Sequence, residues 1–137
     1  MSSTVFFQVT LFQISAIFNT SVGLVLLFVH QWLFSLLGFE ITTVNSYIAI
    51  TQLAGMAILT FGLGYYLVSK NIKQNIGIIK LGIISKIAVF VIFSSAFYHN
   101  NDMLPFFIAG LGELTFVALF IIALKKLSKN NLLANVK

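Results

Sequence analysis

Four long apolar stretches, separated by short polar segments, dominate the pattern of hydrophobic and polar positions along the chain. Each stretch is long enough to cross about 30 Å of hydrocarbon as a helix that rises about 1.5 Å per residue. The pattern predicts an all-α fold: one integral membrane domain over 1–137, built as an antiparallel up-down bundle of four transmembrane helices. The predicted helices are about 5–29, 47–69, 76–98 and 103–124.

Polar residues mark the predicted boundaries. Asn45 and Ser46 are candidate N-caps for the second helix. Asp102 is a candidate N-cap for the fourth, with Pro105 in the first turn, where a missing N–H costs little. The segment 30–38 between the first two helices is too short to span a bilayer. It is expected to form a short interfacial helix.

Aromatic side chains near the predicted ends of the helices are typical of membrane–water interfaces. Trp32 suits the headgroup level beside the short segment. The tyrosines are interpreted as two belts, with Tyr47 and Tyr98 on the outer side and Tyr65 and Tyr66 on the inner side.

The composition excludes several classes of protein. Of the 137 residues, 59% are hydrophobic and 8% are charged, against about 25% charged residues in soluble domains. A soluble enzyme, a disordered chain and a disulfide scaffold are therefore excluded, and the absence of cysteine removes thiol chemistry. The net charge of +5 comes from lysines beside apolar segments, without arginine, so the expected partner is the lipid bilayer and not nucleic acid.

The distribution of lysine predicts the orientation. The loops after the first and third helices contain Glu40 and Asp102 and no lysine. The positive-inside rule therefore places both termini in the cytoplasm, and the four spans predict a multi-pass protein of the cell membrane. The lysines on the predicted cytoplasmic side are Lys70, Lys73, Lys80, Lys125, Lys126, Lys129 and Lys137.

Two charges fall inside predicted spans, Lys86 near the middle of the third and Glu113 near the middle of the fourth. Each costs about 2.5–3.5 kcal/mol at a helix centre on insertion scales. The short loop makes the two helices antiparallel neighbours, and the charges lie about 18 and 16 Å from its ends. We expect them to face each other, either as a neutralised pair that fixes helix register or as a functional centre.

Polar residues of the first two helices are candidates for the same centre. On the first helix, Gln8, Ser15, Asn19, Gly23 and His30 form one stripe. On the second, Gln52, Gly55, Leu59 and Tyr66 share a face. These faces are interpreted either as plain helix packing or as the wall of a pocket. The candidate ligand or ion-pair centre is Lys86, Glu113, Asn19, Gln52 and Ser15.

No metal, cofactor or catalytic residue is predicted. His30 and His99 both lie at the outer interface and are the candidate ligands if haem or zinc binds, but their spacing does not demand a metal. Nucleotide-loop, zinc-protease and nucleophile-elbow motifs are absent from the sequence. The chain is therefore not expected to be an enzyme.

The layout resembles that of the small DoxX-like four-helix bacterial membrane proteins. The features that carry the resemblance are Leu36-Leu37-Gly38 after the first helix, Gly55 with Phe61-Gly62-Leu63-Gly64-Tyr65-Tyr66 in the second, and Gly77 with Leu81-Gly82 in the third. A few members of that group look like accessory subunits of membrane redox enzymes, and the resemblance transfers no catalytic residue.

Three functions follow as hypotheses. The first is a non-enzymatic accessory protein or small-ligand-binding bundle, whose partner is a small polar or amphipathic ligand or a larger membrane complex. The second is a small proton-coupled transporter that acts as a homodimer, because four helices are too few to enclose a transport path. A homo-oligomer is therefore the expected assembly. The third is a subunit of a membrane redox complex that uses His30 and His99.

Overall fold

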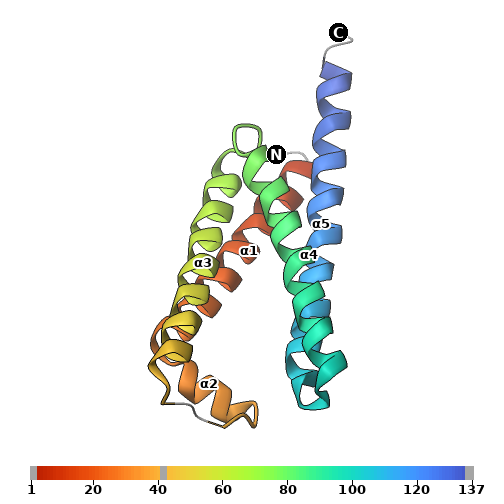
Figure 1. The fold of residues 1–137 in the computed structure, drawn as a ribbon. Helices are drawn as coiled ribbons and strands as arrows, with labels where there is room; N and C mark the ends of the chain where they lie inside the picture. Colours follow the sequence, from red (N-terminus) through yellow and green to blue (C-terminus); the bar gives the residue numbers. More distant parts are fainter. Residues whose placement is uncertain (1–2, 41–42, 135–137) are drawn as a thin grey trace.

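The computed structural model describes residues 3–40 and 43–134, and no strand occurs within them. The all-α prediction is therefore confirmed for this part of the chain. Figure 1 shows the arrangement of its helices. They are α1 (Ser3–Phe28), α2 (His30–Leu36), α3 (Asn45–Lys70), α4 (Ile76–His99), the single 3-10 turn η1 (Asn101–Met103) and α5 (Leu104–Ala134).

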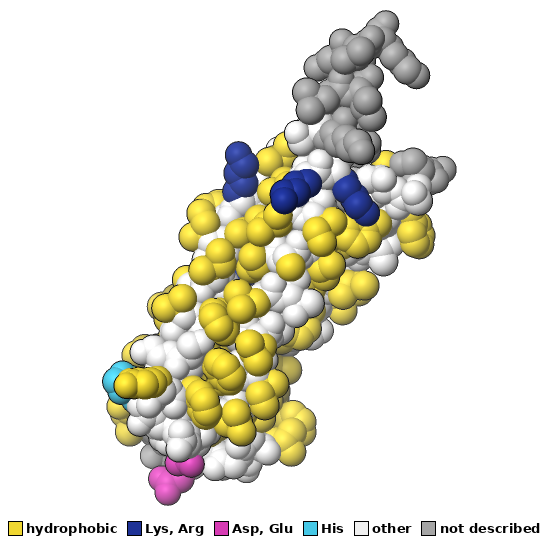
Figure 2. Space-filling view, turned by 90° about the vertical axis from the view of Figure 1, so that its right-hand side faces the viewer, with side chains coloured by type: hydrophobic (Ala, Val, Ile, Leu, Met, Phe, Trp, Pro, Cys, Tyr) yellow, Lys and Arg dark blue, Asp and Glu magenta, His cyan; other side chains and the backbone are white. Residues whose placement is uncertain are grey.

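Four helical segments are long and apolar enough to cross a membrane, namely α1, α3, α4 and the stretch Asn101–Ser128. Large apolar side chains point outward from them, including Ile17, Leu53 and Ile84. Figure 2 shows hydrophobic side chains along most of the visible face. An apolar surface of this extent suits contact with lipid, so the structure supports a multi-pass membrane protein.

The long helices associate as two pairs. Helix α1 packs along α3 and α4 packs along α5, while contacts between the two pairs are fewer. In Figure 1 the pairs converge near the N-terminus and the α3–α4 turn, and they separate toward α2. We call the end where the pairs meet the convergent end, and the end where their backbones separate the divided end.

Glycines allow the backbones of α1 and α3 to touch. A Cβ atom at Gly62 would lie 2.5 Å from Thr20 Oγ1 and 2.8 Å from Thr20 N. At Gly23 it would lie 2.7 Å from the backbone N of Leu59. Small residues at such contacts favour helix association in membranes, where the hydrophobic effect contributes little to the association of helices. This close approach packs α1 and α3 directly against each other as one α1–α3 unit.

Three rings join the pairs at the convergent end. The Phe12 and Phe120 ring centroids are 4.9 Å apart, and those of Tyr65 and Phe120 are 5.1 Å apart. The interpretation of Tyr65 as part of an inner belt is wrong, because this residue is 1% exposed. Consecutive helical residues point about 100° apart, and Tyr66, beside the buried Tyr65, is half exposed. Of the four residues predicted to share one face of this helix, Tyr66 among them, only Gly55 is buried.

The N-cap predictions at the starts of the second and fourth long helices are also wrong. Helix α3 begins at Asn45, and its N-cap, Val44, makes no side-chain capping bond. At the other site Asn100 is the capping residue, because its Oδ1 accepts a hydrogen bond from Asp102 N at 2.9 Å. The extra turn η1 displaces the start of α5 to Leu104, which leaves Pro105 in its first turn as predicted.

The fourth long helix extends ten residues beyond the predicted end at 124, to Ala134. The lysines that end the apolar span are good helix formers, so the span ends before the helix does. The predicted cytoplasmic residue Lys137 lies outside the described residues.

Helix α2 corresponds to the predicted short interfacial segment, and a glycine ends it. Gly38 has φ of +83°, a left-handed conformation that glycine adopts without strain. Its N–H donates to Ser35 O at 3.1 Å, and Phe39 N–H donates to Phe34 O at 2.9 Å. This is the Schellman arrangement of a helix C-terminus. It brings the Phe39 ring against the Phe34 ring, with centroids 6.4 Å apart.

Candidate functional site

A cavity of about 490 Å³ lies between the two helix pairs. All five α-helices contribute to its lining, which is predominantly apolar. The few polar or ionisable side chains on its wall are Asn19, Tyr65, Ser85, Lys86 and Glu113. Its size and composition fall in the range of small-molecule sites, which combine apolar walls with a few placed polar groups.

Lys86 and Glu113 form an ion pair on this wall, between Nζ and Oε2. The lysine side chain is 4% exposed and the glutamate 18%. The predicted meeting of the two charges is therefore confirmed. It follows from the short α4–α5 connection, which places equal depths of the two helices side by side.

Aromatic rings complete the surroundings of the Lys86 ammonium. Its Nζ lies 4.8 Å from the Phe116 ring centroid and 5.7 Å from that of Tyr65. Both distances allow cation–π attraction, which is stronger when water is excluded. A Cβ atom at Gly82 would collide with the Tyr65 phenol, so this glycine makes the room that Tyr65 occupies beside the ion pair.

Sequence reasoning missed the position of Tyr65. The available signal was Gly82, one helical turn before Lys86, since a small residue beside a buried charge admits a large neighbour.

Of the other candidate residues, only Asn19 reaches the cavity. Its Nδ2 donates to Ser15 O at 2.9 Å. Ser15 is fully buried, but its hydroxyl donates to Leu11 O within the same helix and is not part of the cavity wall. Gln52 is exposed, and its Nε2 donates to Leu27 O at 3.2 Å. The structure thus places Asn19 on the same cavity wall as the ion pair and leaves Ser15 and Gln52 outside the cavity.

The stripe predicted on α1 is buried throughout. Its five members, Gln8, Ser15, Asn19, Gly23 and His30, all have low exposure. The polar stripe therefore faces the interior, as predicted, and most of it serves helix packing.

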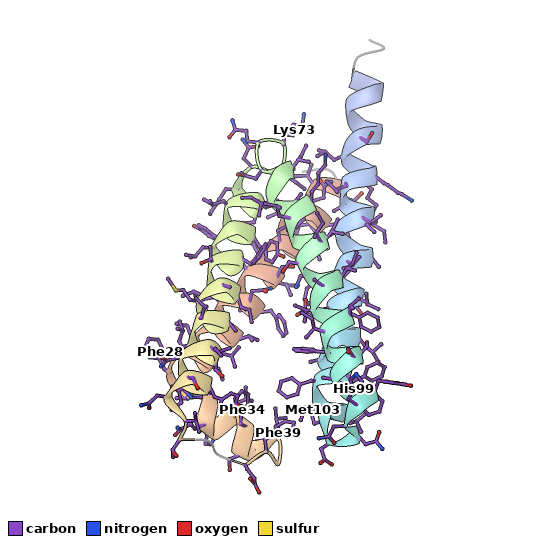
Figure 3. The ribbon with its side chains drawn as sticks, in the orientation of Figure 1. Phe28, Phe34, Phe39, Lys73, His99 and Met103 are labelled. Atoms are coloured by element: carbon purple, nitrogen blue, oxygen red, sulfur yellow. The ribbon has the colours of Figure 1, made fainter. Side chains whose placement is uncertain are left out.

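Four phenylalanines close the divided end of the cavity, and we call them the aromatic bridge: Phe34, Phe39, Phe93 and Phe106. The Phe106 ring stacks on Phe39 at 5.2 Å, lies 5.2 Å from Phe93 and lies 6.3 Å from Phe34. Figure 3 shows Phe34 and Phe39 projecting from the α2 region toward the α4–α5 pair. The bridge connects the two helix pairs where their backbones are apart.

The two histidines lie on different elements. His30 begins α2 and is 8% exposed, with its ring 6.2 Å from Phe34. Neither of its ring nitrogens has a hydrogen-bond partner among the described residues. His99 ends α4, is exposed and contacts the Tyr98 ring (Figure 3). Within 3–40 and 43–134, no three His, Cys, Asp or Glu side chains gather in a metal-binding arrangement.

No family model matches the chain, no curated protein matches it, and no solved structure matches it. The chemistry of the cavity is therefore the basis for inferring a function. Its wall offers a neutral charge pair, an amide and a phenol within apolar surroundings.

Proposed function

We propose that the protein is a non-enzymatic membrane protein that binds a small amphipathic ligand in the cavity between its helix pairs. In this proposal the four spans are antiparallel, and both termini lie on the cytoplasmic side of a bacterial inner membrane. The observation that supports ligand binding is the Lys86–Glu113 pair on the wall of an apolar cavity of about 490 Å³.

The ion pair favours a ligand with an uncharged polar head. Lys86 and Glu113 neutralise each other, so a charged head would leave one charge uncompensated in a medium of low dielectric constant. A hydroxyl or carbonyl head can instead accept a hydrogen bond from the ammonium without disturbing the balance. The apolar wall then accommodates a hydrocarbon body.

A photoactivatable long-chain alcohol tests this proposal. The alcohol carries a diazirine on its chain, and the protein is reconstituted in phospholipid nanodiscs. We expect cross-links on cavity residues such as Val22, Ile58 and Val89, located by peptide mass spectrometry. Excess decanol should reduce them, and decylamine should compete less well because its charge is not compensated.

Two glycine variants provide a test of the cavity and its matched control. Gly112 lines the cavity, and nothing lies within 4 Å of a Cβ built on it, so Gly112→Leu should fill part of the cavity and lower cross-linking about tenfold. Gly77 is equally open but lies outside the cavity, so Gly77→Leu should leave cross-linking unchanged. Equal labelling of both variants and of lipid-facing positions would refute a ligand site.

A small proton-coupled transporter, acting as a homodimer, is the second candidate. It is favoured by helix pairs that meet at one end and separate at the other, which is a geometry that permits rocking about the contact. Glu113 and Lys86 would then exchange partners as substrate binds. Uptake into proteoliposomes that rises with an imposed proton gradient would favour this function over simple binding.

An accessory role in a larger membrane complex is also part of the proposal, and the resemblance to DoxX-like proteins supports it. Purification in mild detergent followed by mass spectrometry of stoichiometric companions would test it. A protein that remains alone under these conditions would count against this role.

A further inference from the structure

A second cavity, of about 360 Å³, lies at the end of the molecule where the helix pairs converge. It is enclosed by the start of α1, the end of α3 with the turn that follows, and α5. Figure 3 labels Lys73 in that turn. The wall carries the polar residues Gln8, Ser69, Lys70, Asn71 and Lys73 beside the apolar residues Val5, Val9, Val68, Ile72 and Leu127.

Internal hydrogen bonds hold three of the polar side chains in place. Gln8 Nε2 donates to Ala123 O at 2.9 Å across the α1–α5 contact, and Ser69 Oγ donates to Tyr66 O at 2.7 Å. Asn71 Oδ1 accepts from Gln74 N at 3.2 Å within the turn. These bonds give the cavity fixed walls, and among the described residues neither of its two lysines forms an ion pair.

No carboxylate side chain is available to neutralise these lysines. The sequence has three acids, and Glu113 is already paired with Lys86. The other two acids are Glu40, which follows α2, and Asp102, which lies in η1. Both are at the divided end. Figure 2 shows the acidic side chains at one end of the molecule and lysines gathered at the other. The Lys70 ammonium lies 4.9 Å from the Tyr66 ring centroid, a contact that leaves its charge uncompensated.

We propose that this second cavity binds the phosphate headgroup of an anionic phospholipid, with Lys70 and Lys73 as its cationic contacts. Basic cavities between helices on the cytoplasmic side of membrane proteins are suited to such headgroups. The apolar residues of the wall, which come from α1, α3, the turn and α5, suit the first carbons of the acyl chains. The occupant is therefore a lipid of the surrounding leaflet. The site rests on the membrane orientation proposed above, and it is independent of ligand binding in the larger cavity.

Native mass spectrometry of the full-length protein tests the lipid site. The protein is released from vesicles that contain equal amounts of phosphatidylglycerol and phosphatidylcholine. We expect the wild type to retain phosphatidylglycerol selectively. The double variant Lys70→Gln/Lys73→Gln should bind it about thirtyfold more weakly, as expected for the loss of two lysines at a membrane surface.

The control carries the same change of charge at the same end of the molecule. Lys80 and Lys125 are exposed and lie outside the second cavity, so Lys80→Gln/Lys125→Gln should retain the lipid almost as the wild type does. Equal losses in the two double variants would show a diffuse electrostatic effect and refute a site at Lys70 and Lys73.

Inorganic phosphate distinguishes a lipid from a free anion. At millimolar concentration it should leave the bound phosphatidylglycerol in place, because it lacks the acyl contribution to binding. Displacement of the lipid by phosphate would identify a free-anion site and overturn the assignment to a lipid. All four lysines in these variants are exposed, and an unchanged melting temperature in neutral detergent confirms that the variants are folded.

Discussion

At the scale of single residues, the buried Lys86–Glu113 pair has the largest energetic consequence. Each charge alone would be unfavourable within a span by about 2.5–3.5 kcal/mol. Their mutual contact removes most of that cost, and the nearby rings of Tyr65 and Phe116 add weaker attraction. Such pairs contribute little net stability relative to an apolar pair, but their disruption is expensive.

Replacing one partner should therefore destabilise the protein more than replacing both. Lys86→Met and Glu113→Gln should each lower the free energy of unfolding by about 3–5 kcal/mol. The double variant should recover most of this loss, and melting temperatures in detergent give the coupling energy. A coupling near zero would contradict the ion pair. If the double variant is stable but no longer cross-links the photoactivatable alcohol, the pair also binds ligand.

The sequence was sufficient to pair Lys86 with Glu113, because depth within a span and a short loop determine which residues of two neighbouring helices meet. It was not sufficient to predict that Tyr65 lies beside this ion pair, or that Asn19 lines the cavity while Gln52 does not. Those outcomes depend on the rotation of α3 about its axis, which the backbone contact at Gly62 fixes. The polar residues of α3 were a poor guide to that rotation, because Gln52 is exposed and donates a hydrogen bond to a carbonyl of α1 instead of facing the cavity.

At the scale of elements, the α1–α3 contact and the end of α2 each depend on a glycine. Gly62 permits backbone approach, and Gly38 supplies a left-handed conformation. The two glycines therefore serve different needs, close packing in one case and chain reversal in the other.

Gly62→Ala should separate α1 from α3, because its Cβ would collide with the Thr20 backbone. We expect a loss of about 1–3 kcal/mol in the free energy of unfolding, the usual cost of overpacking. Gly77→Ala provides the control, since nothing lies within 4 Å of its Cβ, and alanine favours helix over glycine. Denaturant titration in detergent measures both. Equal stabilities would contradict the close contact.

Gly38→Ala should loosen the aromatic bridge, because a left-handed backbone costs an L-residue about 1–2 kcal/mol. The fluorescence of Trp32, the single tryptophan, reports on α2, and we expect its accessibility to a soluble quencher to change. Gly38→Asn should have a smaller effect, since asparagine tolerates this conformation better. An identical response to alanine and asparagine would indicate that φ at this position is not the cause.

At the scale of the whole molecule, charge is divided between the two ends. The second cavity and its lysines lie at the convergent end, and Glu40 and Asp102 lie at the divided end. The lengths of the apolar stretches were sufficient to predict the number of spans and their order along the chain. The separation of the two pairs toward α2 could not be predicted in this way, because it depends on contacts between residues far apart in the sequence, such as Phe34 with Phe106.

The proposed topology is tested with reporter fusions. A reporter after Lys137 should be active as a cytoplasmic fusion, and one inserted between His99 and Leu104 should be active as a periplasmic fusion. Moving lysines to the other side should weaken the preference for cytoplasmic termini. A variant that combines Lys70→Gln/Lys73→Gln with two lysines inserted in the 99–104 loop should yield mixed orientations. The reverse pattern in the unmodified protein would contradict the positive-inside argument.

The location of both buried charges on one helix pair has a consequence for biogenesis. Helix α4 leaves the ribosome before α5. At that stage Lys86 has no partner, since Glu113 follows 27 residues later in the chain. Both members of the pair belong to α4 and α5, which are joined only through the short turn η1. Lateral release from the translocon is therefore most favourable when the two helices leave together as a preformed hairpin, already neutral. The α1–α3 unit needs no such delay, because glycine contacts and not charges hold it together.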